Sequence, residues 1–353
     1  MAKDQANESA PELTISVDGT ELPHEVTESL VALRVEESLD AAGMFALTLA
    51  NSDLDSTKPK WSDDDRFRVG GKVEIKMGPL GEQEPLMAGE ITGLEPVWSG
   101  RRSLFTVRGY DRLHRLRRGR KTRSFLEVKD SAVAQQIAGE LGLQAEVEDS
   151  GETHPYLFQN NQTNIDFLLM RARAVGFELQ VDDRKLFFRK RRYDRGKVVS
   201  LEWGKELESF FPVLTTVPQA QKVVVRGWDR KNKEALVGTA SAGDISNLMQ
   251  GNALGAKDAQ GAFGDAEVRV VDRPIASAAE AEQMAKGILE GLALTYVTGE
   301  GTAVGNPAIR AGTVIELTEL GKRFSGLYYV TATQHVRDAG GFRTHFTVRR
   351  NAA

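Results

Sequence analysis

The side chains that most often bind metals or transfer protons are few and widely spaced in this sequence. No cysteine is present, which excludes thiolate ligands, thiol nucleophiles and disulfides. The five histidines lie far apart along the chain: His24, His114, His154, His335 and His345. His24-Glu25 begins like a zinc-binding helix motif, but Glu28 stands where that motif requires its second histidine. We therefore predict no metal site, and we expect the residues after Pro23 to form a loop.

The motifs that mark other common enzymes are also incomplete. Lys72 and Lys322 each follow a glycine, but both lack the upstream glycine and the following Ser or Thr of a phosphate-binding loop. The glycine-rich residues 299–305 precede a predicted strand, whereas a dinucleotide-binding loop opens a helix. The acidic run 63–65 lacks the ligand spacing of a calcium loop. Other carboxylates leave an acid–base pair open without singling one out. We predict a protein that is not an enzyme, with no catalytic, cofactor-binding or metal-binding residues.

Two clusters of basic residues stand out more than any of these motifs. The first cluster comprises Arg112, Arg115, Arg117, Arg118, Arg120, Lys121 and Arg123. The second cluster comprises Arg184, Lys185, Arg189, Lys190, Arg191, Arg192, Arg195 and Lys197. The clusters flank one predicted α+β module, so they could share a face that contacts phosphates. Phe187, Phe188 and Tyr193 could then supply stacking surfaces for bases.

Nucleic-acid binding through residues 112–123 and 184–197 is therefore the alternative function. Against it, Phe187 and Phe188 lie in a predicted strand, where at least one of two successive rings normally enters the core. No nucleic-acid-binding motif accompanies the clusters, and the net charge of the chain is -4. We favour a solvated or protein-facing basic surface that docks against an acidic partner.

The composition is that of a soluble globular protein with about two to three domains. Apolar residues make up 41% of the chain and charged residues 27%. Residues 1–12 are polar, which predicts a disordered leader and no secretory signal. No window reaches the roughly 18 consecutive apolar residues of a membrane span. We expect synthesis in the cytoplasm without a signal peptide.

Hydrophobic periodicity predicts an α+β fold that is mainly β. Short alternating strands separated by turn residues fill residues 13–116, which we assign to a first antiparallel β-barrel. Residues 117–205 form a small α+β module. Its helices are expected at 131–141, capped by Asp130 or Ser131, and at 164–175, ended by Gly176.

The second antiparallel β-barrel is assigned to residues 206–242 and 298–350. Residues 243–297 interrupt it as a Gly/Ala-rich loop and a helix. Residues 238–264 show little apolar periodicity, which predicts a mobile or poorly ordered loop. Ser277 and Glu280 form a capping box, so a helix is expected from there to about residue 292.

The two barrel segments share a degenerate repeat. FRVG at 67–70 leads into an alternating strand, and IRAG at 309–312 does the same. A short step ending in glycine follows in each copy, and both copies close on FTVR, at 105–108 and at 346–349. Shared strands joined by loops of different length are typical of a duplicated domain. We expect the chain to offer twice as many equivalent faces as it has subunits.

Residues 307–349 resemble the C-terminal part of the phage late control D protein family, the baseplate hub proteins of contractile tails. The resemblance rests on 311–312, 314–317, 324–330, His335 and 341–344. Other segments agree in their order along the chain: 107–111, 159–164, 167–168 and 225–228. The hub part of VgrG proteins and of the spike proteins of contractile injection systems is similar.

This resemblance implies a homotrimeric ring in which each subunit contributes two related barrels, giving six quasi-equivalent modules around a channel. Its implied partners are the hexameric inner tube, the trimeric spike and baseplate wedge components, within a virion or phage-tail-like particle. Because the sequence stops at Ala353, shortly after the last barrel strand, we expect the needle to be a separate polypeptide. The segment near Gly299 leaves no room for a lysozyme-like domain, so no cell-wall cleavage is expected.

Overall fold

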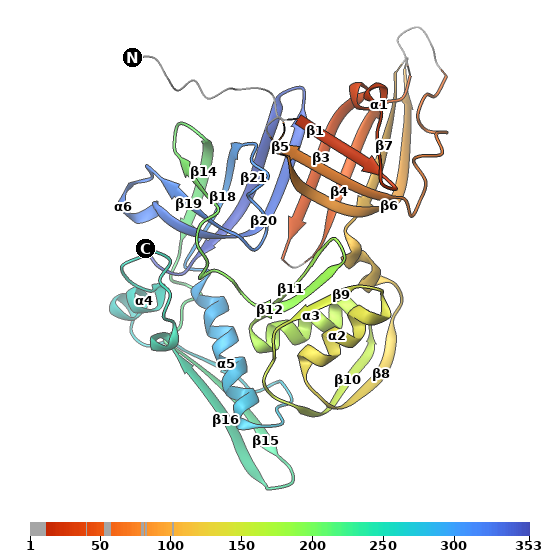
Figure 1. The fold of residues 1–353 in the computed structure, drawn as a ribbon. Helices are drawn as coiled ribbons and strands as arrows, with labels where there is room; N and C mark the ends of the chain where they lie inside the picture. Colours follow the sequence, from red (N-terminus) through yellow and green to blue (C-terminus); the bar gives the residue numbers. More distant parts are fainter. Residues whose placement is uncertain (1–11, 40, 53–57, 79–80, 82, 101) are drawn as a thin grey trace.

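The computed structural model describes residues 12–39, 41–52, 58–78, 81, 83–100 and 102–353. The predicted leader therefore lies outside the described residues, apart from Glu12, which opens the first strand. Two β-rich halves lie next to each other, and a helix-containing part lies below them in the view of Figure 1. Antiparallel strands dominate, which confirms the predicted fold class.

The first β-rich half is a meander of seven strands with a core of alternating apolar side chains. Its strands are β1 (Glu12–Val17), β2 (Thr20–Glu21), β3 (Leu30–Ser38), β4 (Ala41–Ala50), β5 (Lys72–Gly78), β6 (Glu84–Ser99) and β7 (Arg102–Tyr110). They follow one another in the order β3-β4-β7-β6-β5-β1-β2. In β4 the buried positions alternate, with Phe45, Leu47 and Leu49 facing the core. The short helix α1 (His24–Glu28) replaces the loop expected after Pro23, and its buried Val26 anchors it to this core.

The second β-rich half continues the same sheet. Its elements are β13 (Val199–Glu202), β14 (Leu207–Leu214), β18 (Val297–Val304), β19 (Val314–Thr318), α6 (Gly321–Phe324), β20 (Gly326–Asp338) and β21 (Gly341–Arg350). Strands run in the order β14-β18-β21-β20, and β19 joins β20 and β13. The two halves meet where β20 pairs with β3 in antiparallel fashion, so that one 13-stranded sheet spans both.

The α+β module lies under the first half and contains two helices. Its elements are η1 (Arg112–Arg117), β8 (Lys121–Val128), α2 (Asp130–Glu140), β9 (Gln144–Val147), β10 (His154–Gln162), α3 (Asn164–Val175), β11 (Phe177–Asp182) and β12 (Lys185–Lys190). Helix α3 has the predicted bounds, and Gly176 ends it with a φ of 73°. Helix α2 corrects the expected cap, because it begins at Asp130 itself and Lys129 precedes it without a side-chain cap. Asp130 is instead engaged in a buried ion pair.

Residues 238–264 are not the disordered loop that the sequence predicted. They end β16 (Glu234–Ser241), which pairs with β15 (Lys222–Asp229), and they include η2 (Ala242–Asp244) and α4 (Gly255–Phe263). Strands β15, β16 and β17 (Glu267–Val270) form a separate sheet against α5 (Ala278–Ala293). A Cβ at Gly238 would lie 2.1 Å from the backbone of Ala281. Glycine therefore permits close strand–helix packing here, and it hides the apolar pattern by which the strand could have been recognised.

Candidate functional site

Four of the seven cations of the first basic cluster form ion pairs inside the chain. Arg112 is buried, and it lies 3.6 Å from Glu90 and also pairs with Asp183. His114 Nε2 lies 3.0 Å from the same Glu90 carboxylate, which Arg115 also contacts. Burial opposes ionisation of Glu90, but the hydrogen bonds from Arg115 and His114 outweigh it and hold its pKa below the ordinary value. These contacts fasten η1 to strand β6.

Glu140 of helix α2 binds two further members of the first cluster. Lys121 Nζ lies 2.8 Å and Arg123 Nη1 2.6 Å from its carboxylate oxygens. Desolvation opposes ionisation of Glu140, yet the hydrogen bonds from these two cations lower its pKa to about 2. Both charges are thereby compensated within the module.

The second basic cluster is paired in the same way. Each of four cations has its own carboxylate partner: Lys185 with Glu146, Arg189 with Glu178, Arg192 with Glu148, and Lys197 with Glu316. Arg112 of the first cluster meets Asp183 at the start of the second, so the clusters do adjoin. The paired cations hold neighbouring elements together, whereas Arg117, Arg118, Arg184 and Arg195 are exposed.

The three aromatic rings proposed for stacking are also engaged. Phe188 is fully buried and packs on Phe177, with ring centroids 5.3 Å apart. Arg189 covers the ring of Phe187 at 4.3 Å. Tyr193 packs edge-on against Tyr329 at 6.4 Å. Phe188 therefore belongs to the core, and contacts within the chain cover part of Phe187 and of Tyr193, which argues against the nucleic-acid alternative.

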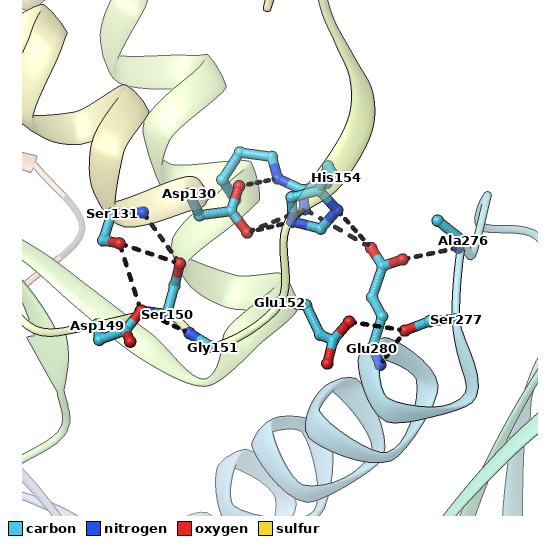
Figure 2. Close-up of polar contacts among 11 residues, drawn as sticks. Asp130, Ser131, Asp149, Ser150, Gly151, Glu152, His154, Ala276, Ser277 and Glu280 are labelled. Carbon is cyan, nitrogen blue, oxygen red and sulfur yellow. Dashed lines mark hydrogen bonds and ion pairs between the residues drawn. The ribbon is translucent and has the colours of Figure 1, made fainter. Parts of the chain in front are cut away.

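A buried polar network ties the α+β module to helix α5 (Figure 2). Asp130 accepts hydrogen bonds from Arg171 Nε at 2.5 Å and from Nη2 at 3.0 Å. His154 lies between two carboxylates, with Nε2 3.0 Å from Asp130 and Nδ1 3.4 Å from Glu280. Burial opposes ionisation of Asp130, but His154 and Arg171 hold its pKa below the ordinary range. Because Asp130, His154, Arg171 and Glu280 pair with one another and no serine of the described residues contacts His154, we interpret the network as structural.

Glu280 also completes the predicted capping box, although with a shifted partner. The Ser277 hydroxyl accepts from the Glu280 N–H at 3.0 Å, and the Glu280 carboxylate accepts from Ala276 N–H at 2.7 Å. Ser277 in turn contacts Glu152 of the α+β module at 3.1 Å (Figure 2). One residue therefore caps α5 and links it to the network.

The remaining histidines do not come together. His24 is exposed and lies 3.3 Å from Glu28 within α1. His345 Nδ1 lies 2.9 Å from the Thr302 hydroxyl, and His335 Nδ1 lies 3.0 Å from the Thr344 hydroxyl. Among the described residues, no group of three or more His, Asp or Glu side chains is arranged to hold a metal ion.

The two β-rich halves repeat the same backbone turn. Gly70 and Gly312 have φ values of 87° and 86°, a region that favours glycine. The Gly70 N–H donates to Ile91 O at 2.8 Å, and the Gly312 N–H donates to Val330 O at 2.8 Å. Ile91 N–H donates back to Gly71 at 2.9 Å, and Val330 N–H donates to Thr313 at the same distance. The repeat read from FRVG and IRAG is therefore a shared structure.

Two irregularities in strand pairing also recur. A register shift follows Ile91 in β6 and follows Val330 in β20. A second shift follows Leu30 in β3 and follows Leu207 in β14. The strand order β3-β4-β7-β6-β5 thus matches β14-β18-β21-β20-β19. Such bulges are specific features of a fold, so their recurrence identifies the two halves as copies.

The closing FTVR segments do not occupy equivalent positions. Ile91 pairs with Gly109 in β7, whereas Val330 pairs with Val348 in β21. Gly109 is thus equivalent to Val348, and the two FTVR segments are offset by two residues. The step ending in Gly89 is offset from Gly326 in the same way, because Gly89 pairs with Val73 and Tyr328 with Ile315. An offset of two residues keeps each side chain on the same face of the sheet, so the alternation of buried and exposed residues is unchanged.

The junction between the halves was not visible in the sequence. Arg310 Nε lies 2.6 Å from Glu37 of β3, and its Nη1 donates to Pro85 O at 2.8 Å. His335 of β20 is buried opposite Val35 of β3. Desolvation and then the Arg310 charge lower the pKa of His335 to about 3, so this ring stays neutral. A groove on the sheet face beside this junction is lined from both halves, for example by Glu36 and Thr347.

A protein-family model described as the Alg8 N-terminal domain matches residues 7–337, most of the chain. The chain belongs to the Alg8 N-terminal domain family. No curated protein matches its sequence. Within the part of the chain that is described, no helix has the length and hydropathy needed to cross a membrane.

Solved structures share the fold of this Alg8 N-terminal domain family member over nearly its whole length. The 43 kDa tail protein of prophage MuSo2 from Shewanella oneidensis matches with a TM-score of 0.71 and 14% identity, covering 97% of this chain and 98% of its own. A tail protein from Neisseria meningitidis matches with a TM-score of 0.68 and 14% identity, covering 97% of each chain. The E. coli c3393 protein, described as a component of the type VI secretion system, matches with a TM-score of 0.60 and 11% identity. It covers 96% of this chain and 77% of its own. These neighbours confirm the predicted fold class and its likeness to phage tail and type VI secretion proteins.

Proposed function

We propose that this chain is the structural hub of a contractile tail or contractile injection system. Three copies form a ring of pseudo-six-fold symmetry that joins a hexameric inner tube to a trimeric spike. The observation that carries the proposal is the pair of structurally equivalent halves, fused edge to edge into one sheet. The tail and type VI secretion proteins that share the fold support the same class of particle.

The physical argument is one of symmetry. A three-fold spike cannot meet a six-fold tube through identical contacts unless each intervening subunit presents two similar faces. Equivalent turns and bulges in the two halves give each subunit two such faces. Tube subunits would then contact six nearly alike modules on one side, and the spike would contact three subunits on the other.

The ion pairs of the basic clusters favour a structural role for these residues over nucleic-acid binding. Ion pairs with carboxylates of the same chain hold η1, α2 and β12 in place. The role is non-enzymatic. The chain acts in the baseplate of a virion or phage-tail-like particle, next to wedge components.

The test is the mass of the purified full chain, alone and after mixing with the tube and spike subunits of the same particle. Light scattering should give three chains per particle, and both partners should co-purify with it. A protein that stays monomeric in all mixtures would contradict the proposal. Retardation of labelled DNA or RNA that weakens steeply with salt would instead support the nucleic-acid alternative.

A further inference from the structure

The 13-stranded sheet has an open edge in each of its two halves. Strand β14 lies at the end of the 13-stranded sheet and pairs with β18; on its other side, among the described residues, only Leu207 at its start forms a bridge, with Trp203. The distal half of β6, residues 93–98, pairs with β7 on one side and with no described strand on the other. Open edges present unpaired backbone groups that natural proteins cover or block.

The repeat makes these two edges equivalent to a junction that already exists. Within the chain, residues 33–38 of β3 pair with residues 332–337 of β20. The equivalent of β3 in the second half is β14, where the matching residues are 210–215. The equivalent of β20 in the first half is β6, where the matching residues are 93–98. The open edge of β14 therefore corresponds to the β3 side of the β3–β20 junction, and the open edge of β6 corresponds to its β20 side.

The side chains on these edges agree with a missing partner. Within the chain the junction is polar on the grooved face of the sheet, where Gln334 Nε2 donates to Glu36 at 2.8 Å. The matching positions on the open edges include Val97, Phe211 and Val213, which are 53%, 70% and 58% exposed. Trp98, at the end of the same segment, is 63% exposed. Large apolar side chains gathered on two open edges indicate surfaces that another protein surface covers.

A proline stands at the centre of each edge. Thr215 N–H donates to Tyr296 of the β18 side at 3.0 Å, so by alternation the nitrogen of Pro212 faces the open edge. Pro96 holds the equivalent position in β6, where His335 stands in β20. Proline on an edge removes a donor and so discourages pairing with unrelated strands. The seam between these edges would therefore depend on side-chain packing more than on a full ladder of backbone hydrogen bonds.

We propose that β14 of one copy lies antiparallel to residues 93–98 of β6 in the next copy, in the register of the β3–β20 junction. That register places Phe211 opposite Val97 and Val213 opposite Glu95. The inference rests on the proposed trimeric ring and names the seam that closes it. The contact is head-to-tail, so three chains with two copies each close after six similar steps.

Engineered disulfides can test the register without background, because the chain has no cysteine. Glu95→Cys with Val213→Cys places two thiols at a non-hydrogen-bonded pair, where Cα atoms lie about 4.5 Å apart, within disulfide range. Both positions are exposed, so folding should be retained. The matched control is Glu95→Cys with Ser209→Cys, four residues away on the same face of β14 and therefore about 13 Å out of register. Seven strand-to-strand steps separate β14 from β6 within one chain, so a link must join two copies.

Mild oxidation should convert most of the Glu95→Cys/Val213→Cys protein into covalent dimers and trimers that a reductant reverses, while the control stays mainly monomeric on denaturing gels. The mass of each variant before oxidation separates the two hypotheses. A trimer that fails to cross-link, or whose control links equally well, overturns the seam and leaves the ring intact. A monomer in every mixture overturns the ring as well.

Discussion

At the scale of single residues, buried ion pairs hold the elements of this protein together. Carboxylates such as Glu90 and Asp130 sit in the interior and are kept ionised by adjacent cations. Removing one partner of such a buried pair leaves an uncompensated charge, which is why these groups occur as complete sets. The sequence revealed the cations as clusters, but it could not reveal their partners, which lie up to 119 residues away, as in Lys197 and Glu316.

Asp111 differs from these carboxylates, since it is buried with its carboxyl aimed at backbone donors. It accepts hydrogen bonds from Gly43 N–H at 2.7 Å and Leu113 N–H at 2.8 Å. Desolvation outweighs these bonds and raises its pKa to about 7. The folded state therefore holds this proton more tightly than the unfolded state, in which the pKa is about 4. This contribution to stability is complete below about pH 4 and is lost as the pH rises to about 7.

Asp111→Asn should therefore change the pH dependence of stability. At pH 4 the variant should be less stable than the parent by about 1 kcal/mol, because an amide keeps only one of the two acceptors. Between pH 4 and pH 7 that deficit should shrink or reverse, since the variant has no charge to bury. Urea unfolding of both proteins at several pH values measures the difference. A constant deficit across this range would show that Asp111 is ionised throughout.

At the scale of elements, close approach between backbones explains what sequence periodicity failed to find. Strand β16 packs on helix α5 through Gly238, where a side chain would meet the backbone of Ala281. The stretch looked like a loop because glycine and alanine carry no apolar signal, although they allow the tightest packing. By contrast, α3 was predicted with its true bounds because its cap, its apolar face and its final glycine are all local.

Gly238→Ala tests this packing. The added Cβ would overlap the helix backbone, so we expect a loss of about 1–3 kcal/mol in the free energy of unfolding. The control is Gly139→Ala in α2, where a Cβ meets nothing within 4 Å and the backbone is helical. That change should be neutral or stabilising by up to about 1 kcal/mol. Equal effects at the two sites in thermal or urea unfolding would contradict the close-packing argument.

At the scale of the whole molecule, duplication within one chain creates the β3–β20 junction between the halves. It also leaves two equivalent strand edges, on β14 and β6, without a partner strand. The apolar residues Trp98 and Phe211 have no role in the core of their own copy. They acquire one only if another subunit covers them. The isolated chain would then be one third of a closed ring. Its aromatic side chains beside the edge prolines are exposed because the neighbouring subunit is missing.

Charges placed across the proposed seam provide an independent check of its register. Phe211→Lys with Val97→Lys would set like charges opposite each other, whereas Phe211→Lys with Val97→Glu would set opposite charges there. We expect the like-charged variant to dissociate about tenfold more readily than the oppositely charged one, because three seams are affected in each ring. Analytical ultracentrifugation at low salt measures the difference. Indistinguishable dissociation of the two variants would remove support for this pairing.

By itself the sequence determined the strand-rich class, the α3 and α5 helices and the existence of a repeat. These features depend on periodicities and helix caps that extend over a few residues, so neighbouring residues in the sequence are enough to predict them. The FTVR match misplaced the repeat by two residues, because a period of two conceals that shift. Only the tertiary structure decided the register of the copies, the partners of the basic clusters and the fusion of both halves through β3 and β20. Each of these depends on contacts between residues far apart in the chain, which no local pattern encodes.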